Sequence, residues 1–539
     1  MTSSIDVADA VVIGSGPNGL VAAITLARKG WDVTVLERNP TPGGAVASAA
    51  LTKPGYVHDP FSAFYGLLHS TPVFRELGLD KRVAWAHFDT PVGAAIDPRT
   101  GAFIHRDLRR TADGLGEDGE AWLELYTWWQ RIGTRFFETM LAPLPSIRPA
   151  LRFARAAKIK GGIDTTRMMV TPVEDIARQR FKTEAAQLAF ACGDSHTDLS
   201  IDQAGSTPMA LILAMLAQQY GMPVPVGGAG RLTDGLVALL EEAGGRIHLA
   251  EAVSSVVVER GRARAVETSR GRVVRARHAI LADTGPGPLF HDLVGDEHLP
   301  TRFLDGLRTF RYGTGMFKVD LALDAPAPWI VKEAAECGVY HLTGTLDNMA
   351  RAAYEARRGL LPSSPMLIVG QQSVADPSRA PEGGHTLWVE THVPPEPRGD
   401  GGSRRKVNGW ATARDAFLER VLARLEEHAP GLGDHIVGTY VRTPVDLQDA
   451  DPNLVGGDVG GGSSAIDQQL IFRPVPGWFR YRTPVKGLYL CSASAHPGGG
   501  VHGMAGRNAS MRALKDSHRP RGVLKTAGGA RRGPTRPAE

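Results

Sequence analysis

The stretch VVIGSGPNGLVAAITLARKGWDVTVLERNPTPGG, residues 11–44, decides the fold. The β-branched run over residues 9–13 has the composition of a buried parallel strand. A glycine-rich turn at residues 14–19 follows directly, and residues 20–29 show the apolar spacing of a helix. Residues 31–36 predict a second strand. The order strand, glycine turn, helix, strand predicts a Rossmann-type α/β unit.

Four residues of the turn and one at the end of the second strand predict what this unit binds. Gly14 permits a tight turn, Gly16 lets a pyrophosphate approach the backbone beside Ser15, and Gly19 allows the helix to pack closely on the strand. The helix N-terminus would face the phosphates with its partial positive charge. Glu37 follows Gly19 by 18 residues, near the distance expected for a carboxylate that binds a ribose hydroxyl. The segment therefore predicts the ADP half of a dinucleotide.

A second glycine-rich segment, GLYLCSASAHPGGGVHGMAGRNAS, occupies residues 487–510. It predicts backbone that lies against the flavin half of the same dinucleotide. Residues 498–503 fit the glycine pattern formally, but no acidic residue follows at the end of a strand about 20 positions on. We therefore expect one dinucleotide, FAD, and electron transfer to oxygen or a quinone rather than to bound NAD(P).

Length and composition are those of an ordinary globular protein. The 539 residues allow two or three domains, with 42% apolar and 22% charged residues. The cysteines are far apart and form no CxxC pair, which argues against a zinc ribbon and a flavin–disulfide reductase. No usual metal-ligand spacing occurs either, so we expect no metal. The cysteines are Cys192, Cys337 and Cys491.

The basic character of the chain comes from its C-terminal end. Residues 512–539 hold eight Lys/Arg and two Asp/Glu and carry +6, whereas the whole chain carries +4, so the remaining 511 residues are near neutral at −2. Rich in Gly, Pro and Arg, residues 513–539 predict a disordered basic tail. No base-reading motif is visible elsewhere, so we expect no nucleic-acid partner.

The sequence predicts a cytoplasmic protein. The N-terminus lacks the basic and apolar regions of a signal peptide. The longest apolar stretch, residues 209–217, has nine residues where a bilayer needs about 20. Residues 147–160 are basic and amphipathic, with Arg148, Arg152 and Arg155 on one helical face. This face is either solvated or in peripheral contact with a membrane.

Between the two glycine-rich segments, the spacing of apolar residues changes from a helical to a strand-like period along the chain. Residues 174–242 predict mainly helices, and residues 247–283 predict a β-meander that ends in a returning strand at 279–282. Residues 317–323 predict a further strand, and residues 415–428 a helix. The oligomeric state is left open.

The chain resembles the phytoene dehydrogenase-like FAD oxidoreductases, within the wider FAD-linked amine oxidase superfamily. Four blocks carry the resemblance: residues 14–65, 226–283, 308–323 and 453–510, the last with the run HPGGGV at 496–501. It implies an α/β fold with a Rossmann-type FAD-binding domain and an interleaved α+β substrate domain of mixed sheet plus helices. The implied FAD-binding domain comprises residues 1–75, 227–290 and 455–512, and the substrate domain comprises residues 76–226 and 291–454.

The resemblance also implies which residues hold the cofactor. Gly14, Ser15, Gly16 and Gly19 would lie at the pyrophosphate, Glu37 at the ribose with Arg38 beside it, and Gly43 and Gly44 on the way to the flavin. Val253 would meet the adenine, Ser492 and Ala493 the pyrophosphate region, and Gly500 and Val501 the pyrimidine edge of the flavin.

Two departures from the family bear on chemistry. Ser492-Ala493 stands where the amine oxidase branch usually has Gly-Glu, which counts against a conventional amine oxidase. His502 stands where many relatives carry a small or apolar residue. Flavin dehydrogenation needs little from side chains, but a base could take the second proton. His502 and His496 are the candidates, and each has a loop-stabilising hydrogen bond as its alternative role.

The sequence therefore predicts an FAD-dependent dehydrogenase or desaturase that passes a hydride from a largely apolar small molecule to the flavin. A flavin oxidase acting on an amine or a natural product is the alternative enzyme. A lipid-binding escort protein without redox activity and an isomerase that uses reduced flavin are further alternatives.

Overall fold

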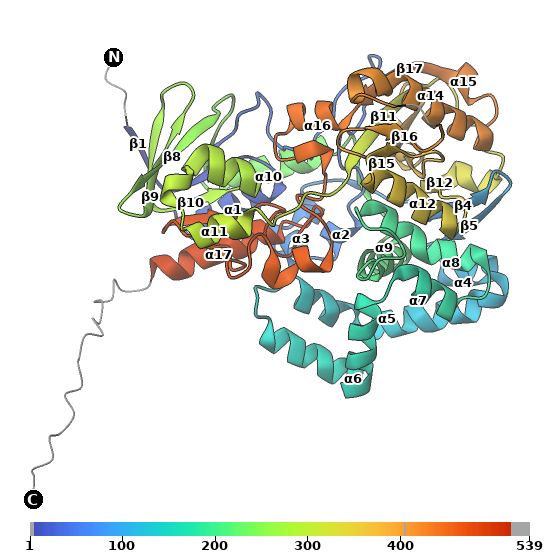
Figure 1. Ribbon diagram of the computed structural model, residues 1–539, viewed down its shortest axis with the longest axis horizontal. Coiled ribbons are helices and arrows are strands. Elements are labelled where there is room, and N and C mark those ends of the chain that lie inside the picture. Colours follow the sequence, from blue (N-terminus) through green and yellow to red (C-terminus); the bar gives the residue numbers. More distant parts are fainter. Residues whose placement is uncertain (1–4, 404–405, 519–539) are drawn as a thin grey trace, which may run out of the picture.

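The computed structural model describes residues 5–403 and 406–518 (Figure 1). Two seven-stranded sheets lie side by side along the long axis of the molecule, and helices surround them. Strands of the first sheet come from three separated parts of the chain, within residues 5–36, 246–282 and 488–490. The second sheet uses the intervening parts. The predicted interleaving of a Rossmann-type α/β unit with an α+β unit is thus present, and the domain boundaries stay a prediction.

The first sheet contains the predicted dinucleotide unit. Its parallel part has the order β7 (Arg246–His248), β2 (Val33–Leu36), β1 (Ile5–Ile13), β10 (Val273–Ala282) and β18 (Leu488–Leu490). The other half of β10 pairs with the antiparallel β9 (Arg262–Thr268), which pairs with β8 (Val253–Glu259). These three form the predicted meander. β1 begins at Ile5 rather than residue 9 because residues 5–8 continue the ladder with β10.

Helices from both ends of the chain pack together on this sheet. α1 (Pro17–Ala27) lies between α10 (Gly230–Glu242) and α17 (Met504–Ser517). Gly506 allows the close approach of α1 and α17, because a Cβ there would overlap the carbonyl oxygen of Asn18. The N-terminal and C-terminal glycine-rich segments are therefore neighbours in space.

The predicted disordered tail begins too early. Residues 513–517 belong to α17, and Ala513 and Leu514 are 1% and 8% exposed. Asp516 forms an ion pair with Arg482. Basic residues occur both in the last turns of this helix and in the Gly/Pro/Arg-rich segment after it, so composition does not mark the boundary between them. Residues 519–539, the rest of that prediction, lie outside the described residues.

The second sheet is mixed. Its order is β17 (Ile436–Arg442), β11 (Gly315–Leu323), β15 (His385–Val393), β14 (Leu367–Gly370), β12 (Cys337–Leu342), β4 (Thr90–Asp97) and β5 (Thr100–Ile104). Neighbours are antiparallel except for β12 and β4. One face is apolar and packs on α14 (Trp410–His428), with Phe317, Val319 and Leu321 in the core. The opposite face, turned away from α14, carries polar side chains.

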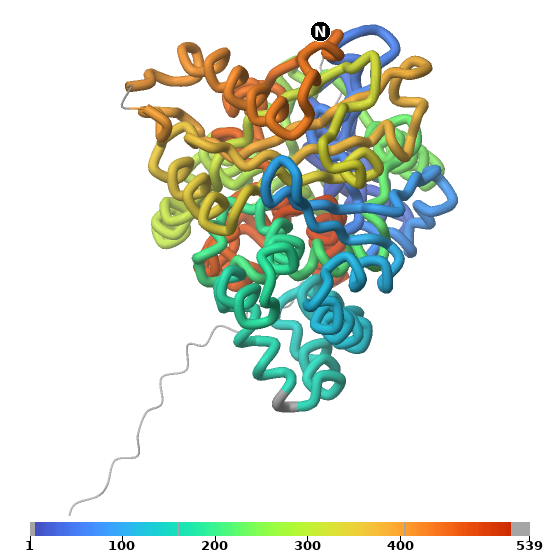
Figure 2. Tube along the Cα trace, turned by 90° about the vertical axis from the view of Figure 1, so that its right-hand side faces the viewer, coloured from blue at the N-terminus to red at the C-terminus, as the bar shows by residue number. Residues whose placement is uncertain are grey.

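A helical hairpin of α5 (Gly119–Met140) and α6 (Ile147–Val170, kinked at Lys158) protrudes from the body in both the ribbon and the tube view (Figures 1 and 2). The aromatic side chains that recur along α5 are mostly buried, as packing of a helix requires. None of the helices in the described ranges combines the length and the apolar character needed to cross a bilayer.

The remaining helices and the short strands fill the space around the two sheets. The helices are α2 (Gly66–His69), α3 (Pro72–Leu77), α4 (Leu108–Gly114), α7 (Val173–Arg180), α8 (Glu184–Ala191), α9 (Thr207–Tyr220), α11 (Thr301–Leu307), α12 (Leu346–Arg357), α13 (Gln372–Ala375), α15 (Leu432–His435) and α16 (Pro444–Ala450). β3 (Trp85–Ala86) pairs with β6 (Val224–Pro225), and β13 (Leu360–Leu361) pairs with β16 (Gly399–Asp400).

Candidate functional site

The glycine turn after β1 has the geometry of a phosphate cradle. Gly14 adopts φ +90°, and a Cβ at Gly19 would overlap the carbonyl oxygen of Gly14. Gly16 is the N-cap of α1 and provides no capping side chain. Gly44 lies against the turn, since its Cβ would be 3.3 Å from the Gly16 Cα. Bare backbone from two segments thus meets at a helix N-terminus, which favours an anionic group.

Glu37 is buried at the end of β2 and faces the same turn. Its Oε2 accepts hydrogen bonds from the Ser15 amide at 2.8 Å and the Ser15 hydroxyl at 2.7 Å. The backbone amide of Glu251 donates to the Glu37 carbonyl, which brings the start of β8, with Val253, towards this end of the cradle. Arg38 is exposed. The structure therefore brings the predicted ribose and adenine residues together.

Asp283 is a residue of this site that sequence reasoning missed. It follows β10 directly, and its Oδ2 accepts a hydrogen bond from the Gly19 amide at 2.7 Å. Burial raises the pKa of Asp283 to about 7, and the nearby Asp451 and Glu37 carboxylates act in the same direction. Its position at the carboxyl end of a parallel strand beside β1 is the signal that could have identified it.

Arg473 holds the C-terminal glycine-rich segment in place. Its fully buried guanidinium donates to the carbonyl oxygens of Ala493, at 3.0 Å, and Gly461, at 2.7 Å. Further bonds reach the carbonyl oxygens of Gly460, Gly462 and Ser463. Burial lowers the pKa of Arg473 to about 10, so the side chain stays charged at neutral pH. The sequence alone did not indicate a role for this residue.

Two carboxylates complete the glycine loop of residues 456–463. Asp458 accepts hydrogen bonds from the amides of Gly313, Gly460 and Gly462. Asp198 accepts from the hydroxyl of Ser463 and the amide of Ser464. The loop therefore connects the segment of Ser492 and Ala493 with the second sheet.

The two candidate histidines have different surroundings. His502 is buried, its Nδ1 accepts from the Met504 amide at 3.0 Å, and its Nε2 contacts the Gly498 carbonyl at 3.1 Å. Both ring nitrogens are thus occupied by the loop that holds Gly500 and Val501, which favours the structural alternative. Nε2 of His496 contacts the Ala142 carbonyl at 2.9 Å, while its buried Nδ1 has no hydrogen-bond partner among the described residues. Burial lowers the pKa of both histidines to about 4.

A row of ionisable side chains crosses the polar face of the second sheet. Cross-strand register aligns Arg442, Lys318, Glu390, Ile368 and His341 on adjacent strands. In the next row, Asp320 accepts from the Lys318 ammonium group at 2.6 Å, and the Trp388 ring lies 5.0 Å from the same ammonium group. Sequence reasoning predicted the strands but missed this row, because its members come from separate segments of the chain.

Burial sets the protonation of this row. It raises the pKa of Glu390 to about 8, with Lys318 opposing the shift and Asp320 adding to it. The His341 ring meets the His196 ring with 3.1 Å between their Nε2 atoms, and burial lowers the pKa of both. At neutral pH the face therefore presents neutral imidazoles and a protonated carboxyl group next to one Lys–Asp ion pair.

The polar face looks towards the segment that follows the glycine doublet. The Trp388 indole donates to the Phe61 carbonyl at 2.8 Å, and Phe61 packs with Met316, Leu447 and Leu454. The residues present fit FAD: the bare backbone of residues 14–19 would hold its phosphates, and residues 492–501 and the second sheet would flank its ring system. When bound, it would supply a hydride acceptor in a largely dry site.

Across residues 5–403 and 406–518, no three His, Cys, Asp or Glu side chains are grouped as metal ligands. Cys192, Cys337 and Cys491 are buried free thiols.

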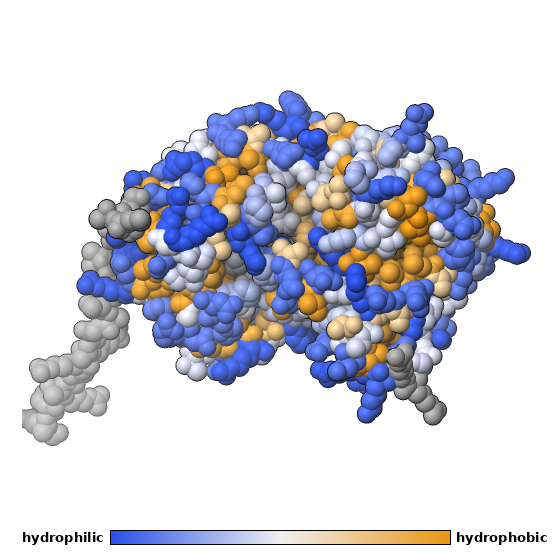
Figure 3. Space-filling model, turned by 90° about the horizontal axis from the view of Figure 1, so that it is seen from above, coloured by the Kyte–Doolittle hydropathy of each residue, from blue (hydrophilic) through white to orange (hydrophobic). Residues whose placement is uncertain are grey.

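On the face seen in Figure 3, apolar patches are interspersed among hydrophilic side chains.

The chain is similar to known proteins over most of its length. The model of the family described as "Flavin containing amine oxidoreductase" matches residues 18–389. A rat protein named pyridine nucleotide-disulfide oxidoreductase domain-containing protein 2 is 27% identical, over 94% of this chain and 93% of its own. The neurosporene-forming phytoene desaturase of Cereibacter sphaeroides is 25% identical, over 94% of both chains. The crystal structure of an oxidoreductase from Methanosarcina mazei superposes with a TM-score of 0.61 at 18% identity, covering 94% of this chain and 99% of that one.

Proposed function

The chain belongs to the family of flavin containing amine oxidoreductases, and from that premise we propose that it dehydrogenates a largely apolar small molecule by hydride transfer to the flavin. That it is an FAD-dependent oxidoreductase follows from the family and from its desaturase relatives. The finer assignment, a desaturating enzyme, draws on the similarity to a phytoene desaturase over nearly the whole chain.

The observation that carries the proposal is the closure of the cofactor site by two distant glycine-rich segments. Gly16 and Gly44 leave the backbone bare at the phosphate end, and Arg473 fixes Ala493 and the loop of residues 460–463 at the other end. Such a frame holds an extended dinucleotide in one orientation. We assign Gly14, Gly16 and Gly19 to the pyrophosphate and Glu37 to the ribose as part of this proposal.

For the remaining assignments, Gly43 would flank the phosphate turn, Arg38 would lie beside the ribose, and Val253 would lie at the adenine. Ser492, Gly500 and Val501 would line the flavin half. His496 is the stronger of the two candidates for a proton acceptor, because its Nδ1 has no partner among the described residues.

Purified protein tests this function directly. We expect the 450 nm flavin band, and bleaching of that band when a dehydrogenation substrate is added without oxygen. A colourless protein whose spectrum does not change on addition of FAD would contradict the proposal. The alternative amine oxidase would be favoured by two results together: amines release peroxide, and they bleach the flavin faster than apolar alcohols or alkenes do.

We further propose that the protruding α5–α6 hairpin makes peripheral contact with an anionic membrane. Ile147 and Leu151, in the part of α6 that precedes its kink at Lys158, are 63% and 55% exposed. Arg148 and Arg152 lie among them and are exposed too. Apolar side chains beside arginines are the combination that binds anionic lipid surfaces, and an apolar substrate would be found there.

Vesicle sedimentation measures this contact. We expect binding to vesicles with 30% phosphatidylserine and at least fivefold weaker binding by the double variant Ile147→Ser, Leu151→Ser. The control Tyr354→Ser removes an exposed aromatic group from α12, outside the hairpin, and should bind as the parent does. Equal sedimentation of all three proteins would refute the contact.

A further inference from the structure

The side chain of Asp283 lies directly against the phosphate turn. A Cβ placed on Gly16 would be 2.6 Å from Oδ2 of Asp283, and one placed on Gly19 would be 3.0 Å from it. The same oxygen accepts the hydrogen bond from the Gly19 amide. Asn453 fixes the backbone on both sides of this contact, since its side chain accepts from the Gly285 amide at 2.8 Å and donates to the Asp283 carbonyl at 3.4 Å. The carboxyl group is therefore held beside the N-terminus of α1.

The second oxygen of this carboxyl group is left without a partner. Asp283 is only 8% exposed, yet its Oδ1 accepts no hydrogen bond from the residues that the structure describes. A protonated carboxyl group accepts through one oxygen and donates through the other. With Oδ2 bound to the Gly19 amide, Oδ1 is the atom available to a ligand in the turn.

The groups that face Asp283 from the neighbouring elements are acidic or neutral. Burial raises the pKa of Asp283, and the negative charges of Asp451, at the end of α16, and Glu37, after β2, add to the shift. The Cys491 thiol, after β18, is buried and uncharged, because burial raises its pKa as well. Arg38 is exposed and acts on Asp451. A pyrophosphate dianion placed in the turn would therefore meet several carboxylates at close range unless one of them were protonated.

We propose that Asp283 binds FAD as a neutral carboxylic acid, which accepts from the Gly19 amide through Oδ2 and donates through Oδ1 to an oxygen of the pyrophosphate. The proposal rests on the proposed function, because it concerns the same cofactor. Protein whose Asp283 is ionised must take up one proton from solution with each FAD, whereas the protonated form takes up none. The pKa of Asp283 is about 7 before FAD binds, so FAD affinity should be constant below pH 7 and fall as the pH rises above it.

Fluorescence titration of the FAD-stripped full chain with FAD, at pH 6 and pH 8.5, tests this role. We expect the Kd of the parent protein to be about tenfold or more higher at pH 8.5. Asp283→Asn keeps an acceptor for the Gly19 amide and a donor for the pyrophosphate but has no proton to lose, so its Kd should be equal at the two pH values. Calorimetry at pH 8.5 in phosphate and in Tris should show uptake of roughly half a proton or more per FAD by the parent, and none by the variant.

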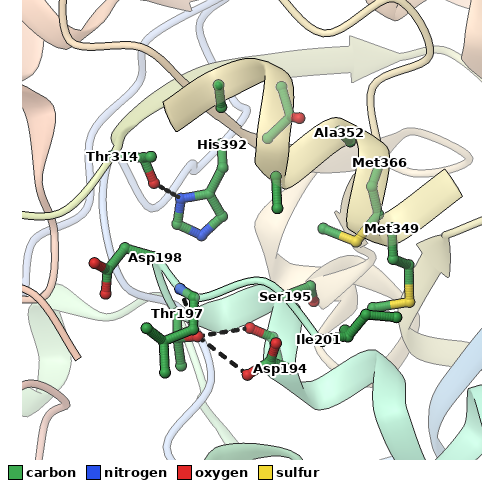
Figure 4. A pocket seen from close by; sticks show the side chains of 14 residues that line it. Asp194, Ser195, Thr197, Asp198, Ile201, Thr314, Met349, Ala352, Met366 and His392 are labelled. Atoms are coloured by element: carbon green, nitrogen blue, oxygen red, sulfur yellow. Dashed lines mark hydrogen bonds between the residues drawn. The ribbon is translucent and has the colours of Figure 1, made fainter. Parts of the chain in front are cut away.

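Two control variants remove other buried carboxyl groups. Asp194→Asn changes an aspartate whose pKa burial also raises, but which lies apart from the glycine turn, where it lines a small hollow beside α12 and contacts Thr197 (Figure 4). It should keep the pH dependence of the parent. Asp451→Asn removes the neighbouring negative charge and should keep the dependence, with its midpoint shifted to lower pH.

An equal Kd of the parent protein at pH 6 and pH 8.5 would overturn the proposal. So would a pH dependence that disappears in Asp451→Asn and persists in Asp283→Asn, because the proton would then belong to the other carboxyl group. Absence of FAD binding at both pH values would overturn the proposed function together with this inference, so the two failures are distinguishable.

Discussion

The two large sheets contain equal numbers of strands but place their functional groups differently. In the first sheet the groups lie beyond the ends of parallel strands: Glu37 after β2, Asp283 after β10 and the glycine turn after β1. In the second sheet they lie within the strands, where Lys318, Glu390 and His341 share a row across one face. Backbone geometry therefore shapes the first site, and side-chain juxtaposition shapes the second.

The first sheet meets a requirement shared by all pyrophosphate sites, whereas the second sheet depends on particular pairs of side chains. A pyrophosphate needs bare amides and a close approach, which glycine provides in any member of such a family. The second sheet holds buried ionisable groups whose pKa values depend on neighbouring charges. A single substitution there therefore alters protonation as well as packing. Variants on each side of the comparison should accordingly fail in different ways.

The largest effect is expected on the first sheet from Gly19→Ala. The added Cβ would overlap the Gly14 carbonyl oxygen, so the turn must open and FAD affinity should fall more than 100-fold. Fluorescence titration with FAD measures the loss. Gly114→Ala is the control, because a Cβ there meets nothing within 4 Å. FAD binding by Gly19→Ala at the parent affinity would refute the role of the cradle.

Arg473→Met, between the two sheets, should lower the free energy of unfolding by about 4 kcal/mol. The exchange removes a buried cation and leaves the carbonyl oxygens of Ala493 and Gly461 without their donor. Urea unfolding monitored by tryptophan fluorescence measures the change, with the exposed Arg480→Met as the control. A loss below about 1 kcal/mol would show that the loop holds itself without the guanidinium.

Glu390→Gln tests the second sheet through pH. The pKa of Glu390 is raised to about 8 in the folded protein, so the folded state binds more protons than the unfolded state between pH 4.5 and 8. Its contribution is therefore fully present below pH 4.5 and is lost as the pH rises through 8, by about 5 kcal/mol in all. The Glu390→Gln variant should lack this part of the slope in urea unfolding at pH 5, 6.5 and 8. The exposed Glu382→Gln should retain it, and parallel slopes for the parent and Glu390→Gln proteins would contradict the buried, protonated state.

The smallest effect is expected where α17 is attached to the first sheet. Asp516 forms hydrogen bonds with Arg482 and with the hydroxyl of Tyr489 on β18. Because the group is partly exposed, Asp516→Asn should cost only about 1 kcal/mol. Thermal unfolding detects it as a small decrease in Tm. No change would mean that Ala513 and Leu514 alone hold this end of the helix.

The sequence predicted the first sheet well because its signal is local. The sequence pattern within each segment predicts its strands and turns without reference to distant residues. This holds for the turn at residues 14–19 and for the meander of residues 247–283. Lys318 and Glu390, by contrast, lie 72 positions apart and become neighbours only through strand pairing. Arg473 was missed for a related reason, since nothing in its flanking residues indicates that five carbonyl oxygens surround it.

The pairing of β18 with β10 and the packing of α17 on α1 have a consequence for biosynthesis. The ribosome completes the glycine turn within the first 20 residues, but the strand and helix that close the site emerge only after residue 487. During nearly all of translation the nascent chain therefore exposes an unfinished cradle. The cradle is therefore closed only once β18 and α17 have been synthesised and have packed on β10 and α1.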